Sequence, residues 1–305
     1  MLKYILPQDK PVSKELFTLA FPVILSNLSR VLMSVVDVAM VGRLGAAALA
    51  ATGMGAMLFW GALSLVIGIR TGVQTVASRR LGQKKYDQCG TALHNGLLMA
   101  TVYGLPMSIA GWLLAKNFIP FFINDIKATP LTVEYSSIIF LGLLFSAYSF
   151  VFQGFYTGVE KTKIHMRVSI TSNVINVYLN AGLIYGSEGV KLFFSETAPS
   201  LSFLSHLWQW TTFPAMGVKG AAIATLVASL WMFVHYGAYL FSKQIKSRFA
   251  VLSLSVNGVM MNRQLRLAAP QGLQEMFIAV GWSMFYKIVG MIGLIELATT
   301  ELLFT

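Results

Sequence analysis

Cysteine is almost absent from this sequence of 305 residues. It has one cysteine, Cys89, and four histidines that lie scattered without the short spacings of metal ligands. A single thiol cannot form a disulfide within the chain, and neither residue type supplies a structural zinc site. We therefore expect no bound metal centre and no organic cofactor, and look for chemistry in the other polar residues.

Charged residues are also scarce. Only 11% of the residues are charged and 56% are hydrophobic, whereas a soluble domain averages roughly 25% charged residues. Several apolar segments reach the ~20 residues that a bilayer core requires. They span 16–41, 48–78, 91–122, 132–157, 165–186, 217–242 and 267–295. The sequence therefore predicts an all-α polytopic membrane protein with the lipid bilayer around it.

Acidic residues are the rarer kind of charge, with 12 Asp and Glu against 23 Lys and Arg. A chain of net charge +11 could bind nucleic acid, but most of its Lys and Arg lie in the polar stretches between the apolar segments. If the N-terminus is inside, fifteen of the 23 Lys and Arg fall in cytoplasmic pieces, five in outer loops and three within segments. This is the positive-inside distribution. We expect a multi-pass protein with a cytoplasmic N-terminus and no nucleic-acid partner.

The chain repeats itself after 248 residues. This shift aligns Leu19, Ala20, Pro22, Val41, Gly42, Gly45, Leu49 and Ala50 with Leu267, Ala268, Pro270, Val289, Gly290, Gly293, Leu297 and Ala298. Internal repeats are common in secondary transporters, whose binding sites lie at the repeat interface. We expect a six-helix N-terminal lobe over 1–242, a cytoplasmic linker over 243–266, and the first one to two helices of a second lobe over 267–305. The short second repeat predicts that the sequence is truncated at its C-terminal end.

One carboxylate stands inside the first segment. Asp37 at membrane depth costs about 2.5–3.5 kcal/mol, so it needs a partner or a function. At ~1.5 Å per residue, Asp37 shares a layer with Asn176 and Asn180 of the fifth segment and Thr225 of the sixth. These side chains predict a cation site, either for Na⁺ through hard oxygen ligands or for a proton on Asp37. The alternative is that the amides and the hydroxyl only join helices by hydrogen bonds.

Two arginines complicate this prediction. Arg30 lies seven residues before Asp37, two turns away on the same helical face, and Arg70 lies within the second segment. Either guanidinium could reach the carboxylate. A tight ion pair would keep Asp37 charged and would oppose proton coupling near neutral pH.

Arg30, Arg70 and three further residues within segments are candidates for substrate contact or for a hinge. Pro22 bends the first helix and serves either as a hinge or as a static kink. Glu275 is a candidate second-repeat counterpart of Asp37 in role, and Lys287 either contacts the substrate or snorkels to the interface. The long outer loop 187–216 ends in aromatic residues, which predicts an interfacial helix, with a ligand lid as the alternative.

Four stretches of the sequence together resemble the multidrug and toxic compound extrusion (MATE) family. They are AFPVILSNLSRVLMSVVDVAMVGRLGAAALAA, SRRLGQ, NVINVYLNAGLIYG and GVKGAAIATL, and the resemblance covers essentially the whole chain. It implies two six-helix lobes related by a pseudo-two-fold axis along the membrane normal. It also implies export of organic, often cationic, compounds in exchange for a cation, H⁺ or Na⁺. We expect a monomer in the plasma (inner) membrane.

The resemblance also places a cation site in the N-terminal lobe. The family's residues fall here on Asp37, Asn176, Asn180 and Thr225, the set reached from their depth. Related members often have aspartate at the position of Asn180. The amide leaves one carboxylate fewer, so the ion and its stoichiometry stay open.

The sequence thus predicts a cation-coupled antiporter that exports small organic, cationic drugs or metabolites by alternating access. One alternative is a flippase for lipid-linked precursors, which Arg30 and Arg70 favour slightly. A second is a polyprenyl-phosphate transferase, but such an enzyme needs paired acids for Mg²⁺ and the cytoplasmic loops offer only the isolated Asp87 and Glu160. We expect no enzyme. A third alternative is a fragment without function, because an incomplete second lobe leaves no inter-lobe cleft to close.

Overall fold

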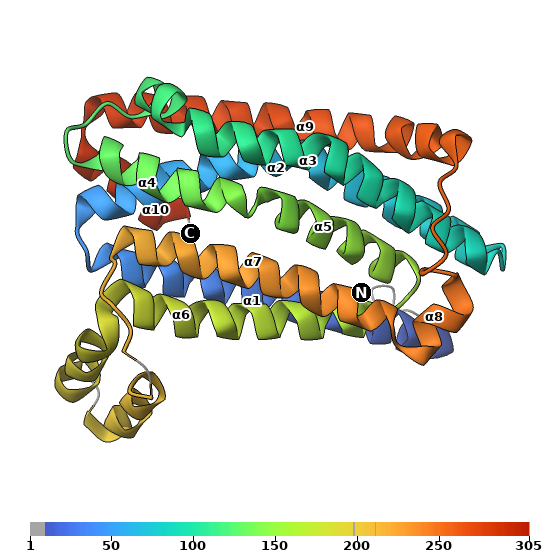
Figure 1. Ribbon diagram of the computed structural model, residues 1–305, viewed down its shortest axis with the longest axis horizontal. Coiled ribbons are helices and arrows are strands. Elements are labelled where there is room, and N and C mark those ends of the chain that lie inside the picture. Colours follow the sequence, from blue (N-terminus) through green and yellow to red (C-terminus); the bar gives the residue numbers. More distant parts are fainter. Residues whose placement is uncertain (1–9, 198, 211, 305) are drawn as a thin grey trace, which may run out of the picture.

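The computed structural model is a bundle of long helices that run side by side (Figure 1). It describes residues 10–197, 199–210 and 212–304, and these residues contain no β-strand. The elements are α1 (Lys10–Gly42), α2 (Ala46–Gly82), α3 (Tyr86–Phe122), α4 (Ala128–Leu141), α5 (Leu143–Gly158), α6 (Thr162–Thr197), η2 (Pro199–Trp208), α7 (Val218–Leu240), α8 (Lys243–Phe249), α9 (Gly258–Ile292) and α10 (Leu294–Phe304). The predicted all-α architecture is confirmed.

The helices match the predicted membrane segments closely. α1 from Leu16 onward, α2, α3, α7 and α9 are each long and apolar enough to cross a bilayer, and α4 and α5 meet the same criteria as a pair bent by 49°. α6 covers the fifth predicted segment but falls short of that apolarity, because three asparagines lie along it. It packs against both α1 and α7. Helical neighbours on two sides shield its polar side chains from lipid.

The seventh helix begins earlier than the sequence predicts. α9 starts at Gly258, where the Asn257 side chain caps it by accepting a hydrogen bond from the Met260 backbone N–H at 2.9 Å. Residues 258–266, assigned above to the linker, are therefore helical. Hydropathy missed them because four of these nine side chains are Asn, Gln or Arg.

The connection between α8 and α9 is fastened to α3. Asn95 exchanges two hydrogen bonds with the backbone of Asn257, both 3.1 Å long. His94 Nε2 donates to the carbonyl oxygen of Val251 at 2.9 Å. These bonds set the position at which α9 starts along the bundle.

The long loop after α6 folds back on the end of that helix. α6 breaks at Gly186, whose φ of 74° favours glycine. Trp208 stacks on Tyr178 with ring centroids 5.1 Å apart, and Trp208 Nε1 donates to the Tyr178 carbonyl oxygen at 2.8 Å. The segment lies beside the end of α6 and α7 (Figure 1), and its membrane position stays a prediction.

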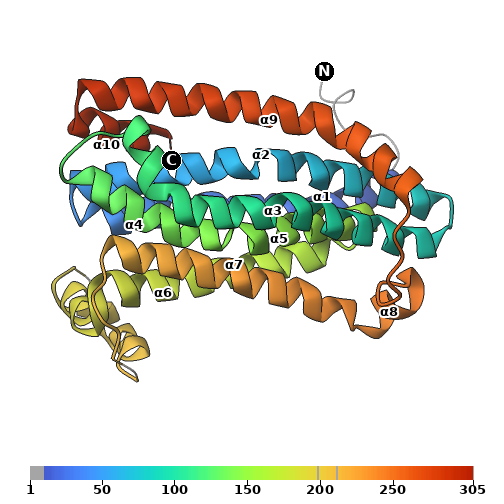
Figure 2. The ribbon, with the colours of Figure 1, turned by 45° about the horizontal axis from the view of Figure 1, so that its top comes forward.

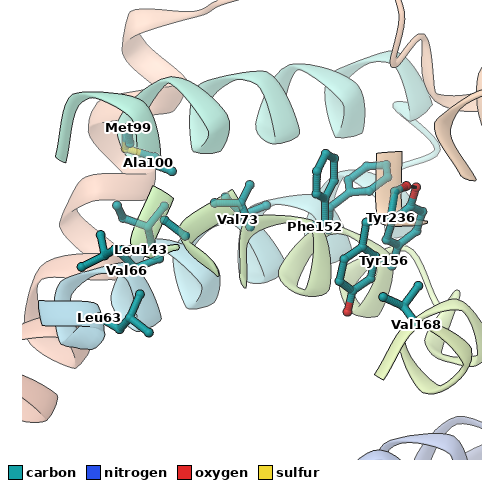
Figure 3. Packing of buried hydrophobic residues seen from close by; sticks show 14 of the residues in the cluster. Leu63, Val66, Val73, Met99, Ala100, Leu143, Phe152, Tyr156, Val168 and Tyr236 are labelled. Atoms are coloured by element: carbon teal, nitrogen blue, oxygen red, sulfur yellow. Dashed lines mark hydrogen bonds between the residues drawn. The ribbon is translucent and has the colours of Figure 1, made fainter. Parts of the chain in front are cut away.

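α2 lies at the centre of the bundle, in contact with α3, α4, α5, α9 and α10. Its side chains Leu63, Val66 and Val73 are buried in one core with Phe152 and Tyr156 of α5 (Figure 3). Figure 2 shows α9 along one side of this core, and α6 with α7 along the opposite side. Because lipid is as apolar as these side chains, close packing holds such helices together.

Two glycines let α2 approach α9 closely. A Cβ at Gly68 would clash with the carbonyl oxygen of Ala268, and one at Gly72 would lie 2.6 Å from the carbonyl oxygen of Gln264. Neither oxygen can retreat unless the backbone of α9 moves. The glycines therefore set the distance between the two helices.

We predict that Gly68→Ala destabilises the protein by about 1–3 kcal/mol, because the added methyl group overpacks the contact with α9. The measurement is thermal unfolding in detergent, followed by tryptophan fluorescence. Gly61→Ala is the matched control, since its Cβ would meet the Ala279 Cβ at an ordinary 3.7 Å. Equal unfolding midpoints for the two variants would contradict the prediction.

Candidate functional site

Asp37 is held by an asparagine of a neighbouring helix. It lies near the C-terminal end of α1, where α1 packs along α6. Asn180 Nδ2 donates to Asp37 Oδ1 at 2.5 Å and to Asn176 Oδ1 at 2.9 Å. Both asparagines are buried. The structure therefore brings together three of the four predicted side chains.

Asp37 and Asn180 border a cavity of about 120 Å³. Its polar lining comes from six helices and consists of Ser34, Asp37, Thr52, Tyr135, Asn180, Thr225 and Glu301. Thr225, the fourth predicted residue, lines the cavity and donates its hydroxyl proton to the Ala221 carbonyl oxygen at 3.0 Å. No Lys, Arg or His of the described residues lines this cavity. The space is sufficient for a small cation with a few waters.

The amide oxygen of Asn180 is buried without a donor among the described residues. The amide nitrogen of Asn180 serves both Asp37 and Asn176. A buried acceptor without a partner costs about 1–3 kcal/mol, and such atoms mark places for an ion, a water or a ligand. Carboxylate, amide and hydroxyl oxygens around one hollow are the donors that a Na⁺ ion prefers, so these residues fit a hard cation.

A second carboxylate lines the same cavity, and the sequence analysis missed it. Glu301 of α10 accepts a hydrogen bond from the Tyr286 hydroxyl at 2.8 Å. It also lies against Gly53 of α2, where a Cβ would clash with its carboxylate. The sequence offered one signal for it, a carboxylate within the apolar stretch Leu294–Phe304, but this stretch also contains Glu296.

Both arginines that could have paired with Asp37 bond elsewhere. Arg30 Nη2 donates to Asn27 Oδ1 at 3.2 Å, one turn away on α1. Arg70 Nη1 donates to Gln153 Oε1 of α5 at 3.4 Å. The carboxylate of Asp37 therefore faces its cavity without a guanidinium as partner.

The remaining candidates lie outside the Asp37 cavity. Glu275 of α9 accepts a hydrogen bond from Gln271 of the same helix at 3.0 Å. It does not line the Asp37 cavity, where the second-repeat carboxylate is Glu301. Lys287 Nζ lies 3.3 Å from the centre of the Phe121 ring, a cation–π contact. Pro22 is buried within α1, which stays helical on both sides of it. In the described part of the chain, no group of three His, Cys, Asp or Glu could hold a metal ion.

The chain is similar to known proteins in its sequence and in its fold. The chain is 26% identical over 248 residues to a probable multidrug resistance protein NorM of Idiomarina loihiensis, which covers 80% of this chain and 48% of the relative. It is also similar to solved outward-facing and inward-facing conformations of a multidrug resistance MATE family transporter of the MOP superfamily. The TM-scores are 0.73 and 0.71 at 20% and 19% identity, over 90% and 94% of this chain and 54% and 60% of those chains.

The structural likeness at this identity shows a shared fold, and the chain spans about half the length of the relatives it matches. The family itself is shown by sequence, because the model of the MatE family matches residues 22–181, more than half of the chain. The chain therefore belongs to the MatE family, the multidrug and toxic compound extrusion transporters.

Proposed function

We propose that this chain is the cation-binding lobe of an antiporter that exports organic cations in exchange for H⁺ or Na⁺. The observation that carries the proposal is the Asp37 carboxylate, which faces a cavity with a second carboxylate and no basic side chain in its described lining. An ionised carboxylate at membrane depth costs about 2.5–3.5 kcal/mol. Asp37 therefore holds a proton or a metal cation when no cationic substrate is near.

Exchange follows when the coupling cation and the substrate compete for the same negative charge. A cation that binds at Asp37 neutralises the charge that attracts an organic cation beside the cavity, and the substrate weakens cation binding by the same factor. If the coupling cation is H⁺, the Asp37 carboxylate alone is sufficient to bind it. Na⁺ would also use the amide oxygen of Asn180 and the hydroxyl group of Thr225 as ligands.

The cavity also offers a physical link between cation binding and conformation. Five of the helices that line it belong to the first repeat, whereas α10 with Glu301 belongs to the second. A ligand shifts a conformational equilibrium only by its differential affinity for the two states. If α10 moves with the second repeat, one state has two carboxylates around the cation and the other has Asp37 alone.

We predict that Asp37→Asn lowers the efflux of a fluorescent cationic dye at least tenfold, because the amide cannot take up a proton and carries no charge. The measurement is efflux from energised cells that express the chain extended to two lobes. Proteoliposomes with an imposed pH or Na⁺ gradient then identify the coupling ion. Asp87→Asn at the start of α3, outside the cavity, is the control and should transport like the unchanged protein.

Two outcomes would count against the proposal. If the dye leaves equally fast with asparagine at position 37, coupling occurs elsewhere. If the unchanged protein moves no dye at all, the flippase hypothesis, which rests on Arg30 and Arg70, becomes the better one. The transferase hypothesis is set aside, since members of this family are transporters.

A second variant tests the role of the other carboxylate. We predict that Glu301→Gln raises the dye concentration for half-maximal efflux about tenfold, which corresponds to about 1.4 kcal/mol, but keeps ion-coupled efflux. Glutamine retains the shape and the hydrogen bond to Tyr286 and removes only the charge. Glu296→Gln, on the same helix and outside the cavity, should leave this concentration unchanged; an equal effect in both variants would refute a specific role for Glu301.

A further inference from the structure

A second polar cavity lies about two turns along α1 from Asp37, toward the N-terminal end of that helix. It has a volume of about 150 Å³ and is lined by side chains of α1, α5, α6 and α7. Arg30, Gln153, His165 and Tyr236 lie in its wall, and the rest of its described polar lining is serine and asparagine. No Asp or Glu of the described residues lines it, so its charge is opposite to that of the Asp37 cavity.

A chain of hydrogen bonds along one wall has only one consistent direction. A guanidinium can only donate, so Gln153 Oε1 accepts from Arg70 Nη1 at 3.4 Å. Gln153 Nε2 then donates to His165 Nε2 at 3.0 Å. His165 is therefore the neutral tautomer with its proton on Nδ1, which donates to the Tyr236 hydroxyl oxygen at 2.6 Å. Because the hydroxyl oxygen of the buried Tyr236 accepts this bond, the Tyr236 O–H can donate its proton to another acceptor.

Positive charge collects at this cavity without a paired carboxylate. Arg30 donates to the neutral Asn27, and the Arg70 guanidinium lies 5.8 Å from the centre of the Phe150 ring. Arg70 Nε is buried with no acceptor among the described residues. Glu275 of α9 is the acidic group whose charge acts on Arg70, but no ion pair joins the two in the described structure. Arg70 is partly buried and Arg30 lines the cavity, and neither forms an ion pair in the described structure. An anion in the cavity would offset the cost of holding this positive charge out of water.

We propose that this cavity binds the carboxylate or phosphate group of an anionic ligand. The Arg30 guanidinium and the Tyr236 hydroxyl group contact the anionic group of the ligand. Arg70 does not line the cavity, but it bonds to Gln153 in the cavity wall and adds positive charge there. The guanidinium fork matches the oxygen spacing of both groups. The proposal does not depend on cation coupling at Asp37, because the two cavities share no lining residue.

The test is thermal unfolding of the purified chain in phosphatidylcholine nanodiscs, followed by tryptophan fluorescence. Inorganic phosphate and acetate are compared with chloride at matched ionic strength. Because a ligand that binds only the folded state stabilises it, we expect phosphate or acetate to raise the unfolding midpoint by roughly 2–4 °C. Chloride should not produce this shift.

Variants that remove one charge or one hydroxyl group show whether the shift in the unfolding midpoint comes from this cavity. Arg70→Gln and Arg30→Gln should abolish the shift, and Tyr236→Phe should reduce it. Arg43→Gln is the matched control, because Arg43 lies over Phe193, 4.3 Å from its ring centre, away from this cavity. If Arg70→Gln does not fold, Arg30→Gln decides, since its side chain is exposed and its loss requires no repacking.

A second set of nanodiscs, with phosphatidylglycerol added, distinguishes the two sources of the anionic group. A shift with phosphate or acetate in phosphatidylcholine alone identifies a soluble anion. A shift only with phosphatidylglycerol, lost in Arg30→Gln, identifies a lipid headgroup. The proposal is overturned if neither arm gives a shift, or if Arg30→Gln retains the full shift in both.

Discussion

The seam between α1 and α6 is the interaction on which the rest of this lobe depends. Lipid offers no hydrogen-bond partners, so each polar group at membrane depth has to be satisfied within the protein. Asn173 Nδ2 donates to Ser29 Oγ at 2.8 Å, Asn180 to Asp37 at 2.5 Å, and the Tyr185 hydroxyl to the Met40 carbonyl oxygen at 2.5 Å. These bonds recur along the seam and hold α1, a helix with much exposed apolar surface, in one register against the bundle.

Two cavities of opposite character lie at different levels along the same seam. The carboxylate of Asp37 faces one of them and Arg30 lines the other, and the two residues are about 10 Å apart along α1 at 1.5 Å per residue. On the opposite side of the bundle, the glycine contacts of α2 fix α9, and α10 follows α9 directly. Glu301 reaches the Asp37 cavity only because that packing brings α10 against α2. The position of the acidic site therefore depends on both repeats.

Much of this arrangement could be predicted from spacing alone. Asn176 and Asn180 lie four residues apart and so share a helical face, and a count of residues along three segments placed Asp37 at their depth. The early start of α9 could not be predicted, because its first turns are polar and are held by bonds to α3 that no local pattern reports. The partners of Arg30 and Arg70 were also beyond prediction, since a long side chain can reach several neighbours and packing selects one of them.

The sequence by itself determined that the chain is an all-α membrane protein with an internal repeat and one carboxylate in its first helix, because hydropathy, charge asymmetry and periodicity are local properties. Only the tertiary structure decided which polar groups meet. Glu301 joins Asp37 and Glu275 does not, although both acidic residues lie in the second repeat. The reason is that contact across helices depends on rotation and close packing, which the spacing of residues along one helix does not specify.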